Sequence, residues 1–98
     1  MTFGSWYPLQ EAPANTPARS GVFQIRLAQG LLDYPTGKSA MVHYGWSETD
    51  LRAEVLAFTP GAGEPLLCRH VEERYPRAAH DRLREQFIRR FGSPPRLP

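Results

Sequence analysis

The sequence predicts a small α+β domain, with an antiparallel sheet of about three strands and helices packed on it. Short runs rich in β-branched residues alternate in polarity, longer runs repeat an apolar residue every three or four positions, and Gly or Pro separates most of these runs. The predicted order of elements is β-β-α-β-α. The 98 residues suffice for one domain with one modest core.

The first residues of the chain are rich in proline and carry no periodic pattern. We therefore expect an extended arm over residues 1–19 and a folded domain over residues 20–98. Trp6, Tyr7 and Leu9 are too apolar for a free tail, so we expect their side chains to anchor the arm on the domain.

Three β-rich runs supply the predicted sheet. In residues 20–27 the two faces alternate as Val22, Gln24 and Arg26 against Phe23, Ile25 and Leu27. This period of two indicates a strand with one buried face. Residues 40–44 form a second run, and the two runs most simply pair as an antiparallel hairpin with a long loop. A third strand is predicted over residues 66–71.

Two helices complete the predicted domain. Ser47 and Asp50 are typical of a helix N-terminus, and they precede a short apolar stripe that predicts a helix over residues 48–58. A longer helix is predicted over residues 78–91, where an apolar residue recurs every four positions, at Ala79, Leu83, Phe87 and Phe91.

Charge is distributed unevenly along the chain. Residues 1–76 carry six Lys or Arg and eight Asp or Glu, whereas residues 77–98 carry six Arg and two acids, a net of +4. A basic end on a near-neutral body is typical of a surface that contacts a phosphate backbone, and equally of a solvated helix face. The candidate phosphate contacts are Arg77, Arg82, Arg89 and Arg90.

The composition also limits the compartment and the class of partner. The single Cys68 cannot form an internal disulfide, which indicates a reducing, cytoplasmic setting. No apolar run approaches the length that spans a bilayer, so we expect no membrane partner.

Short segments of the predicted hairpin resemble the GIY-YIG nuclease superfamily, in which a Gly-Ile-Tyr strand pairs with a Tyr-Ile-Gly strand and a helix follows. Here the first strand opens with Ser20-Gly21-Val22-Phe23, and the second ends with His43-Tyr44-Gly45 directly before a predicted helix. The end of the chain, from Phe87 to Pro95, is similar to the family's last helix and its proline-containing end. The resemblance covers roughly residues 20–97.

The resemblance implies phosphodiester hydrolysis with a divalent metal ion such as Mg²⁺. In the family, tyrosines of the two strands lie near the attacking water, an Arg of the first helix contacts the phosphate, and a Glu of the last helix holds the metal. Phe23 occupies the first tyrosine position and has no hydroxyl, whereas His43 occupies the second and could act as a base. Tyr44 fills the middle position, and we expect it to pack on the opposite face of the sheet.

The two helix positions depend on the register of the comparison. One register places Glu54 at the family's Arg position and Arg84 at its Glu position. A helical wheel puts Arg84 among apolar residues, so this register predicts a Glu54–Arg84 ion pair across the site. The other hypothesis is a slip of one residue, which restores Glu85 as the metal ligand and Arg52 as a phosphate contact.

The sequence therefore predicts a GIY-YIG-like domain that binds nucleic acid, most simply DNA, weakly and without sequence specificity. We expect its cleavage activity to be impaired or absent, in which case it needs no cofactor. The first alternative is an active metal-dependent DNA endonuclease, a hydrolase that uses His43 and Glu85. The second alternative is a protein–protein interaction module on a small α+β fold.

Overall fold

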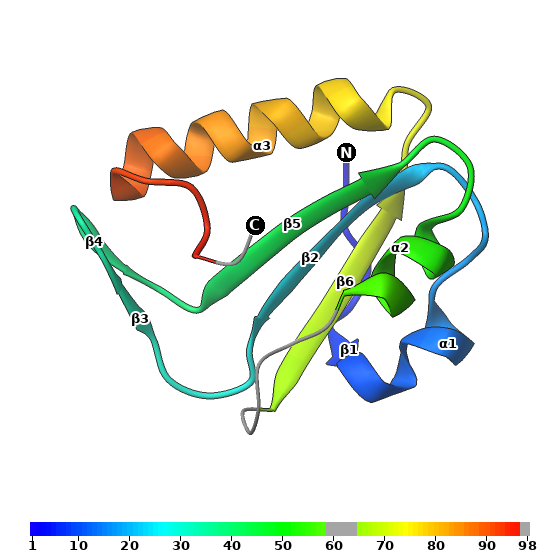
Figure 1. Ribbon diagram of the computed structural model, residues 1–98, viewed down its shortest axis with the longest axis horizontal. Helices are drawn as coiled ribbons and strands as arrows, with labels where there is room; N and C mark the ends of the chain where they lie inside the picture. The colour runs from blue at the N-terminus through cyan, green and yellow to red at the C-terminus, as the bar shows by residue number, and fades with distance from the viewer. Residues whose placement is uncertain (59–64, 97–98) are drawn as a thin grey trace.

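Four antiparallel strands form the main sheet of the computed structural model, in the order β1-β6-β2-β5 (Figure 1). The structure describes residues 1–58 and 65–96. The strands are β1 (Tyr7–Pro8), β2 (Gly21–Leu27), β5 (Met41–Ser47) and β6 (Leu66–Glu72). The α+β class is confirmed, and the sheet has one strand more than the sequence predicted.

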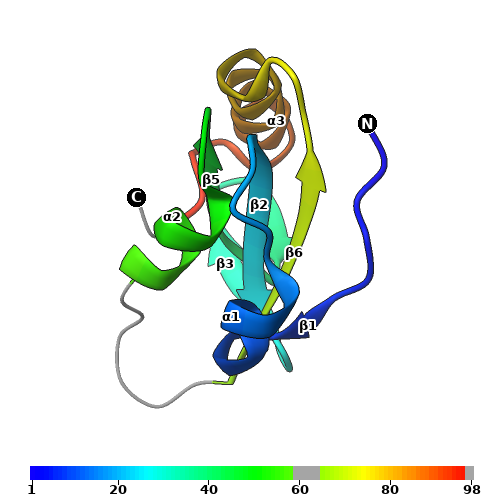
Figure 2. The same ribbon diagram turned by 90° about the vertical axis from the view of Figure 1, so that its right-hand side faces the viewer.

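Helices cover both faces of this sheet. Figure 2 shows α3 (Pro76–Phe91) on one side of the strands and α1 (Ala12–Asn15) and α2 (Leu51–Ala57) on the other. The division follows from the alternation of side chains along β2. Phe23 and Ile25 point to the face that α2 covers, and Val22 and Gln24 point to the face that α3 covers. We call these the α2 face and the α3 face.

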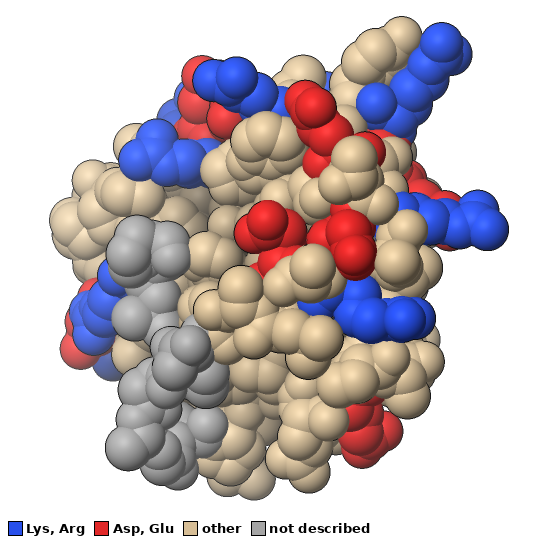
Figure 3. All heavy atoms as spheres, turned by 45° about the vertical axis from the view of Figure 1, so that its right-hand side comes forward, with Lys and Arg blue, Asp and Glu red and all other residues tan. Residues whose placement is uncertain are grey.

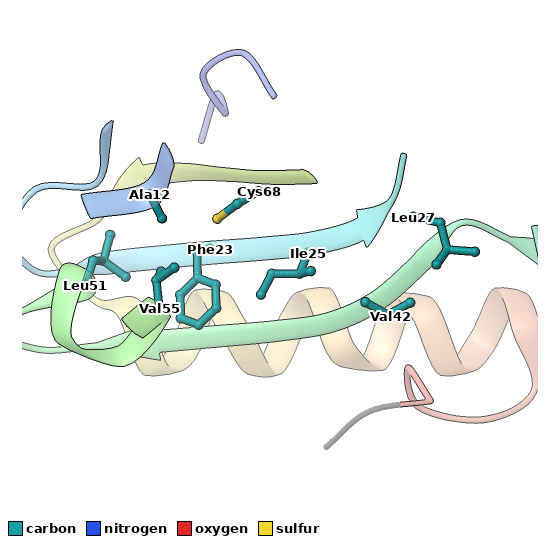
Figure 4. Packing of buried hydrophobic residues seen from close by; sticks show 8 residues of the cluster. All are labelled: Ala12, Phe23, Ile25, Leu27, Val42, Leu51, Val55 and Cys68. Atoms are coloured by element: carbon teal, nitrogen blue, oxygen red, sulfur yellow. The ribbon is translucent and has the colours of Figure 1, made fainter. Parts of the chain in front are cut away.

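The main hydrophobic core lies on the α2 face (Figure 4). Its largest fully buried side chains come from β2, α2 and β6, namely Phe23, Ile25, Leu51, Val55 and Cys68. The apolar stripe predicted for the first helix is therefore confirmed.

The predicted hairpin is also confirmed. Strand β2 pairs antiparallel with β5, with Phe23 opposite Gly45 and Ile25 opposite His43. The long connection between them was expected to be irregular, but it forms a two-stranded ribbon of β3 (Leu32–Tyr34) and β4 (Gly37–Ser39). These strands have three residues each, too few for a polarity pattern to reveal them.

The N-terminal arm carries more structure than predicted. After β1 it forms a 3-10 turn, η1 (Leu9–Glu11), and the single helical turn α1. The anchoring expected for its aromatic residues is confirmed for Tyr7, whose side chain is half-buried and whose backbone pairs with Cys68. Figure 2 shows the first residues running along the outer side of β6, where the Gly4 amide donates to the His70 carbonyl at 3.1 Å.

Local sequence signals explain the ends of the two main helices. The side chain of Asp50 caps α2 by accepting a hydrogen bond from the Ala53 amide at 3.0 Å. Helix α3 begins at Pro76, whose missing amide proton is not needed in the first turn. It ends at Phe91, and the following Gly92 caps it in a left-handed conformation with φ of 84°.

Candidate nucleic-acid interface

The two aromatic motif positions lie together on the α2 face. The ring centroids of Phe23 and His43 are 5.6 Å apart, and the His43 ring also packs against Phe58 at 4.7 Å. Phe23 is 2 % exposed, so its position is part of the core and is closed to solvent. His43 is half-buried among these rings.

The two motif glycines are required by close approaches within the sheet. A Cβ at Gly45 would lie 2.2 Å from Cζ of Phe23, because the ring covers the Gly45 backbone on the neighbouring strand. A Cβ at Gly21 would lie 2.3 Å from the Val71 carbonyl oxygen and 2.6 Å from Cδ1 of Leu51. Both glycines therefore allow β2 to pack closely against its neighbours.

Tyr44 packs on the α3 face, as the alternation predicts. Its ring lies edge-on to Phe87 of α3, with centroids 5.9 Å apart. The backbone carbonyl of Tyr44 lies 3.3 Å from Nε2 of His80 on the same helix. Burial raises the pKa of the Tyr44 phenol to about 12, although the positive charge of Arg69 opposes the shift.

The predicted Glu54–Arg84 ion pair is wrong. Glu54 lies on α2 and Arg84 on α3, which cover opposite faces of the sheet, and both residues are exposed. The buried stripe of α3 consists of Pro76, Ala79 and Phe87. The helical wheel gave Ile88 equal weight in the apolar arc and so widened it to include Arg84, but Ile88 is only half-buried.

The one-residue slip does not assemble a site either. Glu85 is exposed on α3, across the sheet from Phe23 and His43. Arg52 has a structural contact on the α2 side, where its Nε donates to the Thr16 carbonyl at 2.7 Å. Within residues 1–58 and 65–96, no group of three or more His, Cys, Asp or Glu side chains is placed to hold a metal ion.

The arginines of α3 form the largest set of exposed cations on one element. All of them are exposed, and none pairs with a carboxylate of the described residues: Arg77, Arg82, Arg84, Arg89 and Arg90. In the view of Figure 3, Lys and Arg are interspersed with Asp and Glu rather than gathered into one continuous patch. This distribution fits weak contact with a polyanion better than a deep, specific site.

A second group of cations lies on the α3 face and was not predicted. The guanidinium of Arg26 stacks on the Trp6 ring at 4.1 Å, and that of Arg69 contacts the same ring at 4.4 Å. Arg69 also lies 4.6 Å from the Phe3 ring. The alternation along β2 placed Arg26 on this face, but no local pattern indicated that β6 and the arm bring Arg69 and Trp6 beside it.

Where the arm meets the sheet, a polar network joins β1, α1 and β6. The Tyr7 hydroxyl lies 2.7 Å from Oγ1 of Thr16 and 2.9 Å from Nδ1 of His70, and the Cys68 thiol points to it at 3.7 Å. Burial raises the pKa of Tyr7, and it raises that of Cys68 to about 11. Burial lowers the pKa of His70, which the nearby carboxylate of Glu72 only partly opposes. This network fixes the arm, and burial keeps the thiol protonated although its hydrogen bond to Tyr7 opposes the rise in pKa.

Among the described helices, none is long and apolar enough to cross a membrane. No protein-family model matches the chain, and no curated protein or solved structure matches it at a significant level.

Proposed function

We propose that this chain is a nucleic-acid-binding domain of GIY-YIG-like architecture that does not cleave by the family's usual route. The observation that carries the proposal is the row of exposed arginines on α3, which have no carboxylate partner among the described residues. Arginine is well suited to phosphate because its planar fork can donate two parallel hydrogen bonds. The expected binding is electrostatic and insensitive to sequence.

The arrangement of the motif segments supports the architectural part of the proposal. Strand β2 opens at Gly21, pairs antiparallel with β5, and α2 follows three residues after β5 ends at Ser47. Both motif glycines lie where a side chain cannot fit. The close packing at these glycines is a physical reason for the Gly-Val-Phe and His-Tyr-Gly segments. A chance similarity of sequence would have no such reason.

The motif positions also favour a binding role over hydrolysis. Phe23 is buried and cannot activate water, because it has no hydroxyl. The active alternative requires His43 and Glu85 to act on one phosphate, yet they lie on opposite sides of the sheet. A metal held by Glu85 would therefore be remote from any base at His43.

Two assays on the intact protein test this proposal. Supercoiled plasmid incubated with Mg²⁺ or Mn²⁺ should stay unnicked, and labelled single- and double-stranded DNA should bind at low salt. Metal-dependent nicking that disappears in His43→Ala would restore the endonuclease alternative. Absence of binding at low salt would remove the nucleic-acid role and leave a protein partner as the better hypothesis.

A further inference from the structure

Arg26, Arg69 and Trp6 form a compact group on the α3 face, which we call the arginine–tryptophan cluster. Residues Gln24 and Arg69 are direct neighbours on paired strands, and Nε of Arg69 donates to Oε1 of Gln24 at 2.7 Å. Gln24 is 3 % exposed, so this hydrogen bond holds the Arg69 guanidinium from beneath. Trp6 then contacts both guanidinium groups. The two forks are held in place before any ligand arrives.

The cluster concentrates positive charge without neutralising it. Neither arginine pairs with a carboxylate of residues 1–58 or 65–96. Burial lowers the pKa of Arg69, and the charge of Arg26 lowers it further. The Trp6 ring offsets part of this cost through cation–π attraction, but a ring cannot cancel two full charges.

Most of the hydrogen-bond donors in the cluster have no acceptor among the residues that the structure describes. An Arg side chain carries five N–H donors in one plane. Arg69 uses only Nε on Gln24, and Arg26 donates to none of the described residues. Both residues are half-buried, but no buried side-chain nitrogen of the described residues lacks a partner, so these donors face solvent, where a ligand can reach them. Each planar guanidinium can donate two parallel hydrogen bonds to the oxygens of a phosphate group.

We infer that Arg26 and Arg69 bind a backbone phosphate of single-stranded nucleic acid, with Gln24 and Trp6 as positioning residues. The inference rests on the proposed function and assigns it a second contact point. A single strand suits the site better than a duplex, because its flexible backbone can bring one phosphate down to half-buried guanidinium groups. The half-buried Phe3 ring beside Arg69 offers a neighbouring base a stacking surface.

The test compares two substitutions in the cluster with one matched control. Arg26→Gln and Arg69→Gln each remove one charge from the site. Arg74→Gln removes the same charge from an exposed arginine outside it, which stacks on Tyr75 at 5.4 Å. Affinity for an oligothymidylate of about 12 nucleotides is measured by anisotropy over a range of salt concentrations. Circular dichroism checks that each variant folds, and Arg26→Gln is the safer one because its side chain donates no hydrogen bond to a described residue.

We expect each cluster variant to bind the oligonucleotide about tenfold more weakly and to lower the salt slope by about 0.7, the value for one phosphate contact on a single strand. Arg74→Gln should keep the wild-type slope, and Arg69→Lys should recover only part of the affinity because it restores charge without the fork. The loss should be smaller with a duplex of the same length.

A second readout separates the source of the phosphate. Inorganic phosphate should shift the indole N–H resonance of Trp6 in the wild type and not in Arg26→Gln. If the protein binds DNA and both cluster variants keep the wild-type affinity and slope, the inference is wrong while the proposed function stands. If the wild type binds no nucleic acid, the proposed function fails and the single strand is excluded as ligand. A phosphate-dependent shift of Trp6 would then leave only a small phosphate as the ligand, and no shift would reject the site altogether.

Discussion

The ring of Phe23 lies directly over the backbone of Gly45, so that a Cβ at Gly45 would come within 2.2 Å of the ring. These residues are direct partners in the pairing of β2 with β5. The contact explains why Phe23 and Gly45 occur together, because the ring leaves no room for a Cβ on the residue opposite it. The contact also helps to bury the Phe23 side chain in the core.

This contact predicts that Gly45→Ala destabilises the domain. The Phe23 ring is fully buried and cannot move aside without displacing its neighbours, so we expect a loss of about 1–3 kcal/mol in the free energy of unfolding. Gly4→Ala is the matched control, because the nearest atom to its Cβ would be 3.8 Å away. Urea denaturation measures both variants, and equal stability of the two would contradict the packing described.

The Tyr7 hydroxyl is predicted to stabilise the arm through its bond to Thr16. Tyr7→Phe removes the partner of a threonine that is 1 % exposed, which should cost about 1–3 kcal/mol. Tyr75→Phe serves as the control, since that residue is 65 % exposed and its loss should fall within about 0.5 kcal/mol. Thermal unfolding compares Tyr7→Phe with Tyr75→Phe. Similar melting temperatures for the two variants would show that the network does not contribute to stability.

The same network predicts a dependence of stability on pH. Burial lowers the pKa of His70 in the folded state, so the unfolded chain binds the proton more readily. Stability is therefore fully present above the unfolded pKa of about 6.5 and is lost as the pH falls below it. We expect the urea midpoint to fall between about pH 7.5 and pH 5.5 in the wild type and to change less in His70→Asn. The same fall of the urea midpoint in both proteins would mean that another titratable group causes the pH dependence.

We expect substitutions at Glu54 and Arg84 to change the free energy of unfolding independently of each other. Because they are exposed on helices that cover opposite faces of the sheet, a double-mutant cycle of Glu54→Ala and Arg84→Ala should give a coupling energy within about 0.5 kcal/mol of zero. Equilibrium unfolding of the wild type, both single variants and the double variant measures it. A coupling energy several times that size would support the Glu54–Arg84 ion pair.

The main elements could be predicted from the sequence because their signals are local. The alternation in residues 20–27 predicted the strand, but the expectation of one buried face was wrong, because helices cover both sides of the sheet and both faces of β2 are buried. The four-residue repeat from Ala79 to Phe87 correctly indicated the buried side of α3. The pairing of β2 with β5 as a hairpin could be predicted because the two strands are consecutive in the predicted order. Strand β1 and the β3–β4 ribbon are too short to carry such a pattern.

The candidate sites were harder to predict because they depend on which face of the sheet each helix covers. Nothing local to Glu54 or Arg84 indicates that α2 and α3 pack on opposite sides. Likewise, Trp6, Arg26 and Arg69 come from the arm and two strands, and only the sheet order brings them together. Four exposed arginines of α3 could be predicted from the apolar repeat, namely Arg77, Arg82, Arg89 and Arg90, whereas Arg84 was wrongly placed among the apolar residues.

The salt dependence of nucleic-acid binding distinguishes a phosphate-binding surface on α3 from a helix face that is only solvated. We expect the wild type to bind DNA at about 50 mM salt, with log affinity falling linearly and steeply as log salt rises. Arg89→Glu combined with Arg90→Glu should weaken binding and flatten the slope, because both side chains are exposed on the basic helix. Arg19→Glu combined with Arg74→Glu changes the net charge equally, elsewhere on the surface, and should keep a slope close to that of the wild type. No binding at low salt, or equal losses in the two double variants, would contradict nucleic-acid binding by α3.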